Sequence, residues 1–216
     1  VYQQNMQIGV AKTSPAHTTR LRRIDLWIAP LNYLKDQVGE LTRFSTKKVK
    51  MVPLSVDLKA LNENIPTREV ARGHFGLNDQ DIVIGMMGRI DPHKSQHLVI
   101  DAFLSLAEDY PNLKLLFVGA KTEGEWDEYY QNIQKKISDP TINSRVALCD
   151  FMENTAYFYQ AIDTFVMASE KETFGMVTVE AMAFGKSIAG TNTAGTKELL
   201  DNEKFGYYFE PKSGIF

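Results

Sequence analysis

The sequence predicts an α/β fold, a doubly wound parallel sheet with helices on both faces. Its apolar runs are short and continuous rather than alternating with polar residues, as in strands that are buried on both faces. Segments with apolar residues at helical spacing separate these runs, so that strands and helices alternate along the chain. Such helices supply the right-handed crossovers that parallel strands need.

Five apolar runs predict the strands of this sheet. They are residues 82–87, 115–118, 146–149, 164–168 and 187–189. Four segments predict helices, at residues 95–109, 125–138, 153–161 and 176–184. Ligands of such sheets bind beyond the carboxyl ends of the strands, so we expect a site in the loops that follow the apolar runs.

Residues 1–50 show a less regular pattern of apolar runs than the rest of the chain. A strand is expected at residues 26–29, and a helix over residues 32–44, where apolar residues follow one another at helical spacing. A basic helix end at residues 18–23 precedes this strand. A short strand at residues 50–54 then leads into a polar connector.

The composition is that of an ordinary soluble globular protein. The 216 residues are 44% hydrophobic and 24% charged, and the formal net charge of -3 argues against a nucleic-acid partner. The one cysteine, Cys149, can form no internal disulfide and lies in an apolar run, which predicts a small buried hydrophobe. The lack of a disulfide framework favours a reducing, cytoplasmic location. No run approaches the roughly 18 apolar residues of a membrane span.

Two cations and a glycine follow the first strand of the predicted sheet. Gly88 allows the backbone to approach a ligand closely, and Arg89 offers a planar fork to phosphate oxygens. Lys94 adds a second positive charge beside the helix expected at Ser95, whose N-terminal amides also favour an anion. The loop therefore suits a diphosphate, although a solvated charged loop would have the same composition. Neither a Walker motif nor a dinucleotide-binding glycine pattern is present.

His93 and His97 are spaced so that they could share one face of a helix, as metal-binding pairs do. The pair lacks the adjacent glutamate of a zincin helix, and no third ligand is evident. A solvated helix start is the favoured interpretation, and no metal site is predicted.

Two glutamates follow the strand predicted at residues 164–168. A helix is expected to begin near Gly175, which places Glu172 in the preceding loop and Glu180 on the second turn. The backbone amides of residues 173–176 would then point out of the helix start toward an anion or a sugar hydroxyl. A carboxylate at Glu180 can accept two hydroxyl hydrogen bonds from a ribose diol. A place on the exposed stripe of the helix would require no ligand.

These residues carry a resemblance to a known family. The segment E-T-F-G-M-V-T-V-E-A-M-A-F-G, with Glu172 and Glu180 eight positions apart, resembles the signature of family-4-type retaining glycosyltransferases of the GT-B fold. Three further segments resemble family motifs in the family's order: residues 52–57, Gly88-Arg89 with Lys94, and residues 191–198. The similarity covers about residues 50–211.

The resemblance assigns a role to each site residue. Arg89, Lys94 and Glu172 are the catalytic candidates: the two cations would bind the donor diphosphate and the glutamate the donor sugar. The donor-binding candidates are Gly88, Thr173, Phe174, Gly175, Glu180, Asp150 and Met152, with Glu180 on the ribose and residues 150–152 beside the base. The family needs no metal and no cofactor, because the two cations neutralise the leaving diphosphate.

Several positions depart from the family pattern. Asp150 stands where a glycine is usual, which leaves the identity of the base unpredictable. Ser95 replaces a common glycine, Ala194 replaces the first residue of a double glycine, and Leu54-Ser55 replaces Asn-Gly in the connector. These three look like tolerated loop variation.

The resemblance also implies a domain organisation. Residues 1–50 would be a remnant of the acceptor-side N-terminal domain with the interdomain connection, and residues 51–216 a donor-binding Rossmann-like C-terminal domain that lacks its final helix. We therefore expect the chain to be a fragment that is inactive without the missing N-terminal domain. Peripheral membrane association of the full enzyme is a further expectation.

The implied reaction transfers a hexosyl unit from a nucleoside-diphosphate sugar to an acceptor hydroxyl, with retained anomeric configuration. Carbohydrate or glycoconjugate acceptors in polysaccharide or glycoconjugate synthesis are the usual setting. Two alternatives stay open: a GT-B sugar-nucleotide epimerase or phosphorylase, and a non-catalytic nucleotide-binding fragment.

Overall fold

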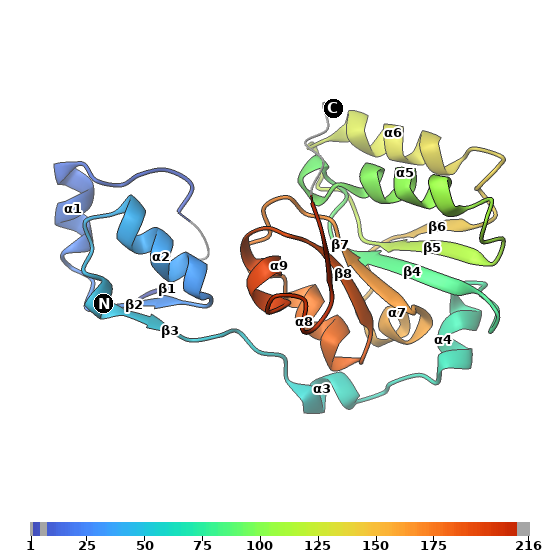
Figure 1. Cartoon of the computed structure of the whole chain (residues 1–216), viewed down its shortest axis with the longest axis horizontal. Helices are drawn as coiled ribbons and strands as arrows, with labels where there is room; N and C mark the ends of the chain where they lie inside the picture. The colour runs from blue at the N-terminus through green and yellow to red at the C-terminus, as the bar shows by residue number, and fades with distance from the viewer. Residues whose placement is uncertain (1, 5–7, 211–216) are drawn as a thin grey trace.

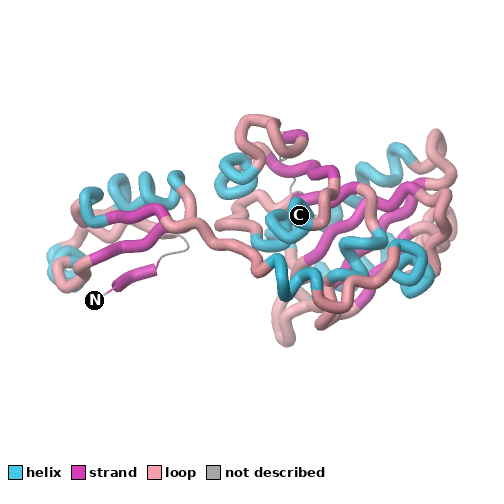
Figure 2. Tube along the Cα trace, turned by 90° about the horizontal axis from the view of Figure 1, so that it is seen from below, coloured by secondary structure: helices cyan, strands magenta, loops and turns pink. Residues whose placement is uncertain are grey.

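A computed structural model of the chain describes residues 2–4 and 8–210. Figure 1 shows two units that an extended segment joins, a small unit at the N-terminus and a larger one built on a second sheet. The tube view from below shows the same two units and the same single connection (Figure 2). The expected domain boundary at residues 50 and 51 falls close to the end of the small unit's last strand, Val49–Met51.

The large unit is built on a six-stranded sheet in the order β6-β5-β4-β7-β8-β9, with every neighbouring pair parallel. Its strands are β4 (Ile82–Met87), β5 (Leu113–Val118), β6 (Val146–Cys149), β7 (Thr164–Met167), β8 (Ser187–Thr191) and β9 (Tyr207–Phe209). The chain starts in the middle at β4, moves outward to β6, and then returns to β7 on the other side of β4. This order is that of a doubly wound dinucleotide-binding sheet, whose strand order reverses between β4 and β7.

Helices cover both faces of this sheet (Figure 1). They are α4 (Arg68–His74), α5 (Gln96–Leu106), α6 (Asp127–Ile137), α7 (Ala156–Ala161), α8 (Met176–Ala183) and α9 (Ala194–Leu199), with the short α3 (Leu58–Asn62) in the connector. One apolar core packs α4, α7 and α8 against the sheet, with Phe158 and Phe165 fully buried. A second core packs α5 and α6 against the other face, around Phe103 and Phe117. The predicted fold class is confirmed.

The small unit is a three-stranded parallel sheet in the order β1-β2-β3. Its elements are β1 (Tyr2–Gln4), α1 (Pro15–Leu21), β2 (Leu26–Ala29), α2 (Asn32–Leu41), the 3-10 turn η1 (Thr46–Lys48) and β3 (Val49–Met51). Leu34 and Val38 of α2 are fully buried, in a core that also contains Phe174 of the large unit. The two units therefore share an apolar contact.

Several predicted boundaries shift. The helix expected over residues 32–44 ends at Leu41, because Thr42 is extended and its hydroxyl donates to the carbonyl of Val38, 2.6 Å away. Elements α3, α4, α9 and β9 were not predicted, since their sequences are short or polar. Cys149 is half-buried rather than buried, because it ends β6 beside the exposed Asp150. The expectation that the donor-binding part lacks a final helix concerns the chain after residue 210, which lies outside the described residues.

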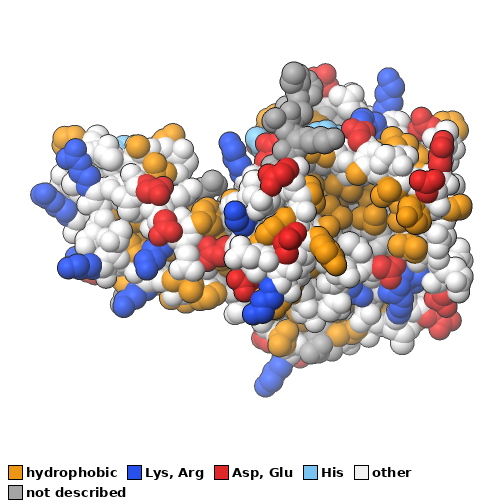
Figure 3. Space-filling model, viewed as in Figure 1, with side chains coloured by type: hydrophobic (Ala, Val, Ile, Leu, Met, Phe, Trp, Pro, Cys, Tyr) orange, Lys and Arg blue, Asp and Glu red, His pale blue; other side chains and the backbone are white. Residues whose placement is uncertain are grey.

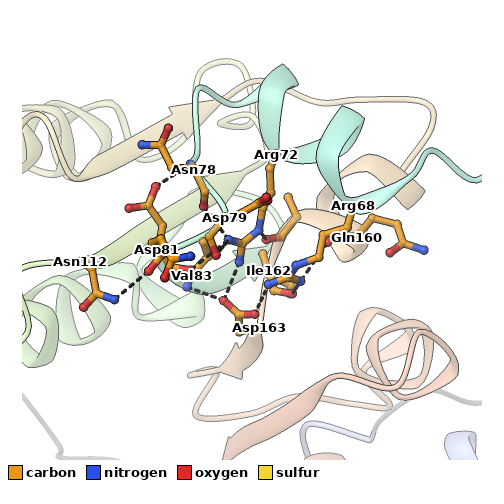
Figure 4. Close-up of polar contacts among 12 residues, drawn as sticks. Arg68, Arg72, Asn78, Asp79, Asp81, Val83, Asn112, Gln160, Ile162 and Asp163 are labelled. Carbon is orange, nitrogen blue, oxygen red and sulfur yellow. Dashed lines mark hydrogen bonds and ion pairs between the residues drawn. The ribbon is translucent and has the colours of Figure 1, made fainter.

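A buried arginine fixes the amino ends of β4 and β7 (Figure 4). Arg72 of α4 is 1% exposed and donates to the carboxylate of Asp163, 2.8 Å away. Its guanidinium also donates to the backbone carbonyls of Asn78, Asp79, Asp81 and Ala161. The same carboxylate accepts from the backbone N–H of Val83 at 2.8 Å. This cluster links the central strand pair, β4 and β7, at its amino end.

No helix in the part of the chain that the structure describes is both long and apolar enough to cross a membrane. Figure 3 shows positive and negative side chains interspersed over the viewed face rather than gathered in a patch of one sign.

Candidate functional site

The loops that follow β4 and β7 meet at the carboxyl edge of the sheet. Lys94 ends the 3-10 turn η2 (Pro92–Lys94) of the first loop, and its Nζ donates to Oε2 of Glu172 in the second at 2.6 Å. The two side chains are 23% and 13% exposed, so the ion pair is largely buried. Because the strand order reverses here, this edge is where a doubly wound sheet binds its ligand. The structure thus brings together two residues that are 78 positions apart in the sequence.

Close backbone packing shapes the first loop. Gly119 directly follows β5 with a φ of 149°, and a Cβ added there would lie 2.0 Å from the carbonyl oxygen of Gly88. Only glycine fits at this contact. Further along the loop, Asp91 caps η2 by accepting from the N–H of His93 at 2.9 Å, and Ser95 takes a left-handed φ of 59° before α5 begins. The backbone that carries Lys94 is therefore well fixed.

Arg89 presents its guanidinium to solvent at the same edge. Its side chain is 65% exposed, and its guanidinium lies 3.4 Å from the hydroxyl of Thr122 and 3.6 Å from the carboxylate of Asp91. Its backbone carbonyl accepts from the amide of Gln96 at 2.7 Å. A fixed backbone with a loosely held guanidinium can turn toward an incoming anion at low cost, and Arg89 remains a candidate for the diphosphate.

Glu180 lies on α8 with one carboxylate oxygen held by a buried tyrosine. The hydroxyl of Tyr159 donates to Oε2 of Glu180 at 2.8 Å. Burial, and then the nearby charge of Glu180, raise the pKa of Tyr159 well above its usual range, so this hydroxyl remains a donor. Glu180 also lines a pocket of about 370 Å³. It is therefore anchored and open to a ligand.

The lining of the pocket is acidic. Its walls come from the connector at residues 55–57, 61 and 63, the segment at residues 153–156 that leads into α7, and α8. Four carboxylates contribute to it, and none of its lining residues is a lysine or an arginine: they are Asp57, Glu63, Glu153 and Glu180. Such a pocket favours groups that donate hydrogen bonds, such as hydroxyls and base N–H groups, and disfavours phosphate.

The remaining candidates occupy different environments. Phe174 is buried in the core shared by the two units, so only its backbone can serve a ligand, and Gly175 starts α8 with a φ of 87°. The carbonyl of Thr173 accepts from the hydroxyl of Tyr33 at 2.8 Å. Asp150 is exposed, and Met152 is partly buried against the apolar core that contains Phe158 and Phe165. Neither of these two lines the pocket, which the same loop reaches through residues 153–156.

The two histidines of the predicted pair differ in exposure: His93 is exposed and His97 is half-buried. His97 is half-buried beside Tyr129, with its Nδ1 3.0 Å from the tyrosine hydroxyl, and burial lowers its pKa. His93 packs edge-on to the ring of Trp126. The expectation of a solvated pair therefore holds for His93, which is exposed, and fails for His97, which Tyr129 of α6 partly covers. Among the described residues no group of three or more histidine, cysteine, aspartate or glutamate side chains is arranged to hold a metal ion.

The contacts of three residues at this edge were not predicted from the sequence. Tyr159 holds Glu180, while Tyr33 and Glu198 join the small unit to the loop of Glu172 and to α9. Their partners are 21 to 166 positions away in the sequence, beyond any local spacing pattern. The only signal available was the position of Glu198 at the end of the motif at residues 191–198.

Comparison with known proteins gives the family. Residues 67–214 match the glycosyl transferases group 1 family. Spore coat protein SA of Bacillus subtilis (strain 168) is 29% identical over 194 residues, covering 83% of this chain and 51% of that protein. The lipopolysaccharide 1,2-N-acetylglucosaminetransferase of Salmonella typhimurium is 30% identical over 194 residues, covering 86% and 49%. The chain spans about half the length of the curated relatives it matches.

Solved structures share the fold. A glycosyltransferase from Rickettsia africae ESF-5 superposes with a TM-score of 0.85 at 17% identity, covering 98% of this chain and 56% of that one. Anabaena Alr3699/HepE, crystallised in complex with UDP, gives a TM-score of 0.82 at 24% identity, covering 98% and 58%. These likenesses extend over both units and place the architecture among GT-B glycosyltransferases. With its wound sheet, the paired loops at its switch point and a family match over more than half its length, this chain belongs to the glycosyl transferases group 1 family.

Proposed function

We propose that the chain binds a nucleoside-diphosphate sugar at the carboxyl edge of the six-stranded sheet. The whole protein would transfer the hexosyl unit to an acceptor hydroxyl in polysaccharide or glycoconjugate synthesis. The observation that carries the proposal is the division of charge at this edge. Two cations, Arg89 and Lys94, lie in the loop after β4, and an acidic pocket is lined by Glu180. A ligand with an anionic middle and a hydroxyl-rich end matches this division.

The ion pair between Lys94 and Glu172 suggests how the donor would bind. A diphosphate offers the ammonium of Lys94 stronger charge-assisted hydrogen bonds than one carboxylate does. Lys94 would turn to the diphosphate, and Glu172 would then accept hydrogen bonds from hydroxyls of the donor sugar. The nucleoside would lie toward the pocket, where the anchored Glu180 can accept from both hydroxyls of a ribose.

The proposed reaction retains the anomeric configuration. The bond between the anomeric carbon and the diphosphate oxygen breaks as the acceptor oxygen bonds to the same face of that carbon. The acceptor proton passes to the departing diphosphate. The charge that develops on the leaving group would be stabilised by Arg89 and Lys94, so that no metal is needed in this scheme.

The similarity to Anabaena Alr3699/HepE supports a nucleotide ligand, since that protein was crystallised with UDP and with UDP-glucose. We also propose a cytoplasmic location, on the basis of the single cysteine of the chain. Association of the whole enzyme with the membrane surface is part of the same proposal.

A ligand-binding screen of the chain tests the proposal. Binding to the native state raises Tm, so UDP, GDP, ADP, dTDP and their sugars should be compared by thermal denaturation. One of these bases should raise Tm by a few degrees, and Lys94→Gln should reduce that shift. The matched control is Lys136→Gln, which removes a lysine paired with Asp101 on the helices of the α5–α6 layer. No shift with any nucleotide, or an equal loss in both variants, would reject the proposal.

Product analysis of the full-length enzyme with a labelled donor tests the reaction class. Transfer of the label to an acceptor with retained configuration is the expected result. Conversion of the donor without an acceptor would indicate an epimerase, and a requirement for phosphate would indicate a phosphorylase.

A further inference from the structure

The loop that carries Glu172 is held from two sides. On the side of the large unit, the N–H of Gly195 at the start of α9 donates to the carbonyl of Glu172 at 3.0 Å. A Cβ at Gly195 would lie 2.6 Å from the carbonyl oxygen of Thr173, so α9 packs directly against the loop backbone. On the side of the small unit, the hydroxyl of Tyr33 donates to that same Thr173 carbonyl at 2.8 Å. The loop therefore depends on a residue of each unit.

A second connection between the units lies one turn further along α9. Helix α2 starts after Leu31, which offers no side-chain cap, and its first turn contains no acidic residue. The carboxylate of Glu198 takes that place: it accepts from the backbone N–H and the side-chain amide of Asn32 at 2.7 and 2.8 Å, and from the backbone N–H of Tyr33 at 2.9 Å. A negative charge on unsatisfied amides at a helix start is favourable. Glu198 thus caps a helix of the other unit.

Apolar packing between the two units partly shields these hydrogen bonds from water. Phe174 is 2% exposed and packs in one cluster with Leu34 and Val38 of α2. Tyr33 is half-buried, and burial, followed by the charges of Glu172 and Glu198, raises its pKa to about 12. Its hydroxyl therefore stays protonated at neutral pH and remains a donor to Thr173. A hydrogen bond in such surroundings is shielded from competition by water.

We infer that Tyr33 is a positioning residue for the donor sugar: docking of the small unit on α9, held by Glu198, fixes the loop that presents Glu172. This inference rests on the proposed function. It separates two parts of the donor site. Arg89, Lys94 and Glu180 are all carried by the large unit, while the loop of Glu172 is completed by the small one. Loss of the contact should therefore weaken recognition of the sugar and leave recognition of the nucleoside diphosphate largely unchanged.

The variant Tyr33→Phe tests this by removing only the donated hydroxyl. Calorimetry would give Kd for UDP and UDP-glucose, or for GDP and GDP-mannose, using the pair that wild type binds more tightly. Kd for the sugar nucleotide should rise about fivefold, as expected for the loss of one hydrogen bond, and Kd for the diphosphate should stay within about twofold. Backbone amides at residues 170–176 should exchange hydrogen faster in the variant. A purely structural role would not change the ratio of the two Kd values.

Tyr208→Phe is the matched control. The hydroxyl of Tyr208 donates to the carbonyl of Lys197 in the same helix α9 at 2.7 Å and accepts from the backbone N–H of Asn202 at 2.9 Å, so both partners lie outside the loop of Glu172 and outside α2. It should leave the ratio of Kd values unchanged. Glu198→Gln should act in the same direction as Tyr33→Phe, with Glu203→Gln as its control. Because Tyr33 and Glu198 belong to one network, the double variant should lose less than the product of the single losses.

The possible failures differ. If wild type binds no nucleoside diphosphate at all, the proposed function fails and this inference with it. If wild type binds, and Tyr33→Phe changes both Kd values equally or neither of them, the positioning role is rejected while the proposed function stands. An equal effect of Tyr208→Phe would likewise reject it, because the contact would then matter only through the stability of α9.

Discussion

The two ends of the central strand pair, β4 and β7, both place a basic side chain against a carboxylate, but their surroundings differ. At the amino end, Arg72 is 1% exposed and its guanidinium is engaged by Asp163 and four backbone carbonyls (Figure 4). At the carboxyl end, Lys94 pairs with Glu172, its one ion-pair partner among the described residues, and Arg89 is mostly exposed with long contacts. A saturated cation can only stabilise the fold, whereas a sparsely engaged one can exchange its partner for a ligand.

The largest expected effect is on stability and concerns Arg72 at the amino end of the strand pair. Arg72→Met should lower the free energy of unfolding by about 4 kcal/mol, because it leaves Asp163 and several buried carbonyls without their partner. Denaturant unfolding would measure this loss. Arg68→Ala is the control: its side chain is 43% exposed in a pair with the same carboxylate, so it should cost less than about 1 kcal/mol. If Arg72→Met and Arg68→Ala lowered the free energy of unfolding by similar amounts, the buried arginine would contribute no more than the exposed one.

Arg89→Ala should reduce activity strongly and stability little, the opposite of what we expect for Arg72→Met. In the full-length enzyme it should lower kcat/KM by about 150-fold, which corresponds to about 3 kcal/mol of transition-state stabilisation, as for the loss of one oxyanion donor. Unfolding of the variant should change little, because the guanidinium makes only long contacts. Steady-state kinetics checks the first expectation and thermal denaturation the second. Activity within about threefold of wild type would reject the role of Arg89.

Lys94→Gln tests whether the ion pair with Glu172 serves a ligand more than it serves stability. The pair is largely buried, so its loss should lower the free energy of unfolding by about 2 kcal/mol, which is less than for Arg72→Met because the guanidinium of Arg72 has more partners. Affinity for the nucleoside diphosphate should nevertheless fall by about tenfold, as for one charge-assisted hydrogen bond. Unfolding and titration of the same preparation measure both quantities. A stability loss as large as that of Arg72→Met would mean that both ends are structural.

The smallest expected effect is a pH dependence at the amino end. Burial alone would raise the pKa of Asp163, but the N–H of Val83 and the guanidinium of Arg68 lower it below the usual 3.8. A depressed pKa in the folded state gives stability that is complete above 3.8 and is lost as pH falls from there through the folded-state pKa. The stability difference between wild type and Asp163→Asn should therefore be constant near neutral pH and shrink below about pH 4. A difference that grows on acidification would contradict this sign.

Much of the fold could be predicted from local patterns. The apolar runs at β4 to β8 are continuous because each strand is covered on both faces, and such runs are legible without a structure. The short polar helices α3, α4 and α9 carry no such pattern, because their places are set by contacts such as that of Arg72 with the ends of two strands. The strand β9 was missed for a related reason: it has only three residues, Tyr207–Phe209.

The candidate site was predictable only in part. Gly88, Arg89, Lys94, Glu172 and Glu180 were found from motifs, and the structure joins Lys94 to Glu172 and opens a pocket beside Glu180. Their roles in binding and catalysis stay predictions. The hydroxyls of Tyr33 and Tyr159 could not be found in this way, since their partners come from remote segments.

The sequence by itself determined which residues could serve a ligand, because the residue type sets whether a side chain carries a charge, donates or accepts hydrogen bonds, or leaves the backbone free to approach. The tertiary structure alone decided how these groups are engaged. Lys94 meets Glu172, Arg72 is saturated, and Glu198 caps a helix of the other unit. The physical reason is that the availability of a charge depends on burial and on the number of its partners, and both are set by segments that meet only when the sheet is wound.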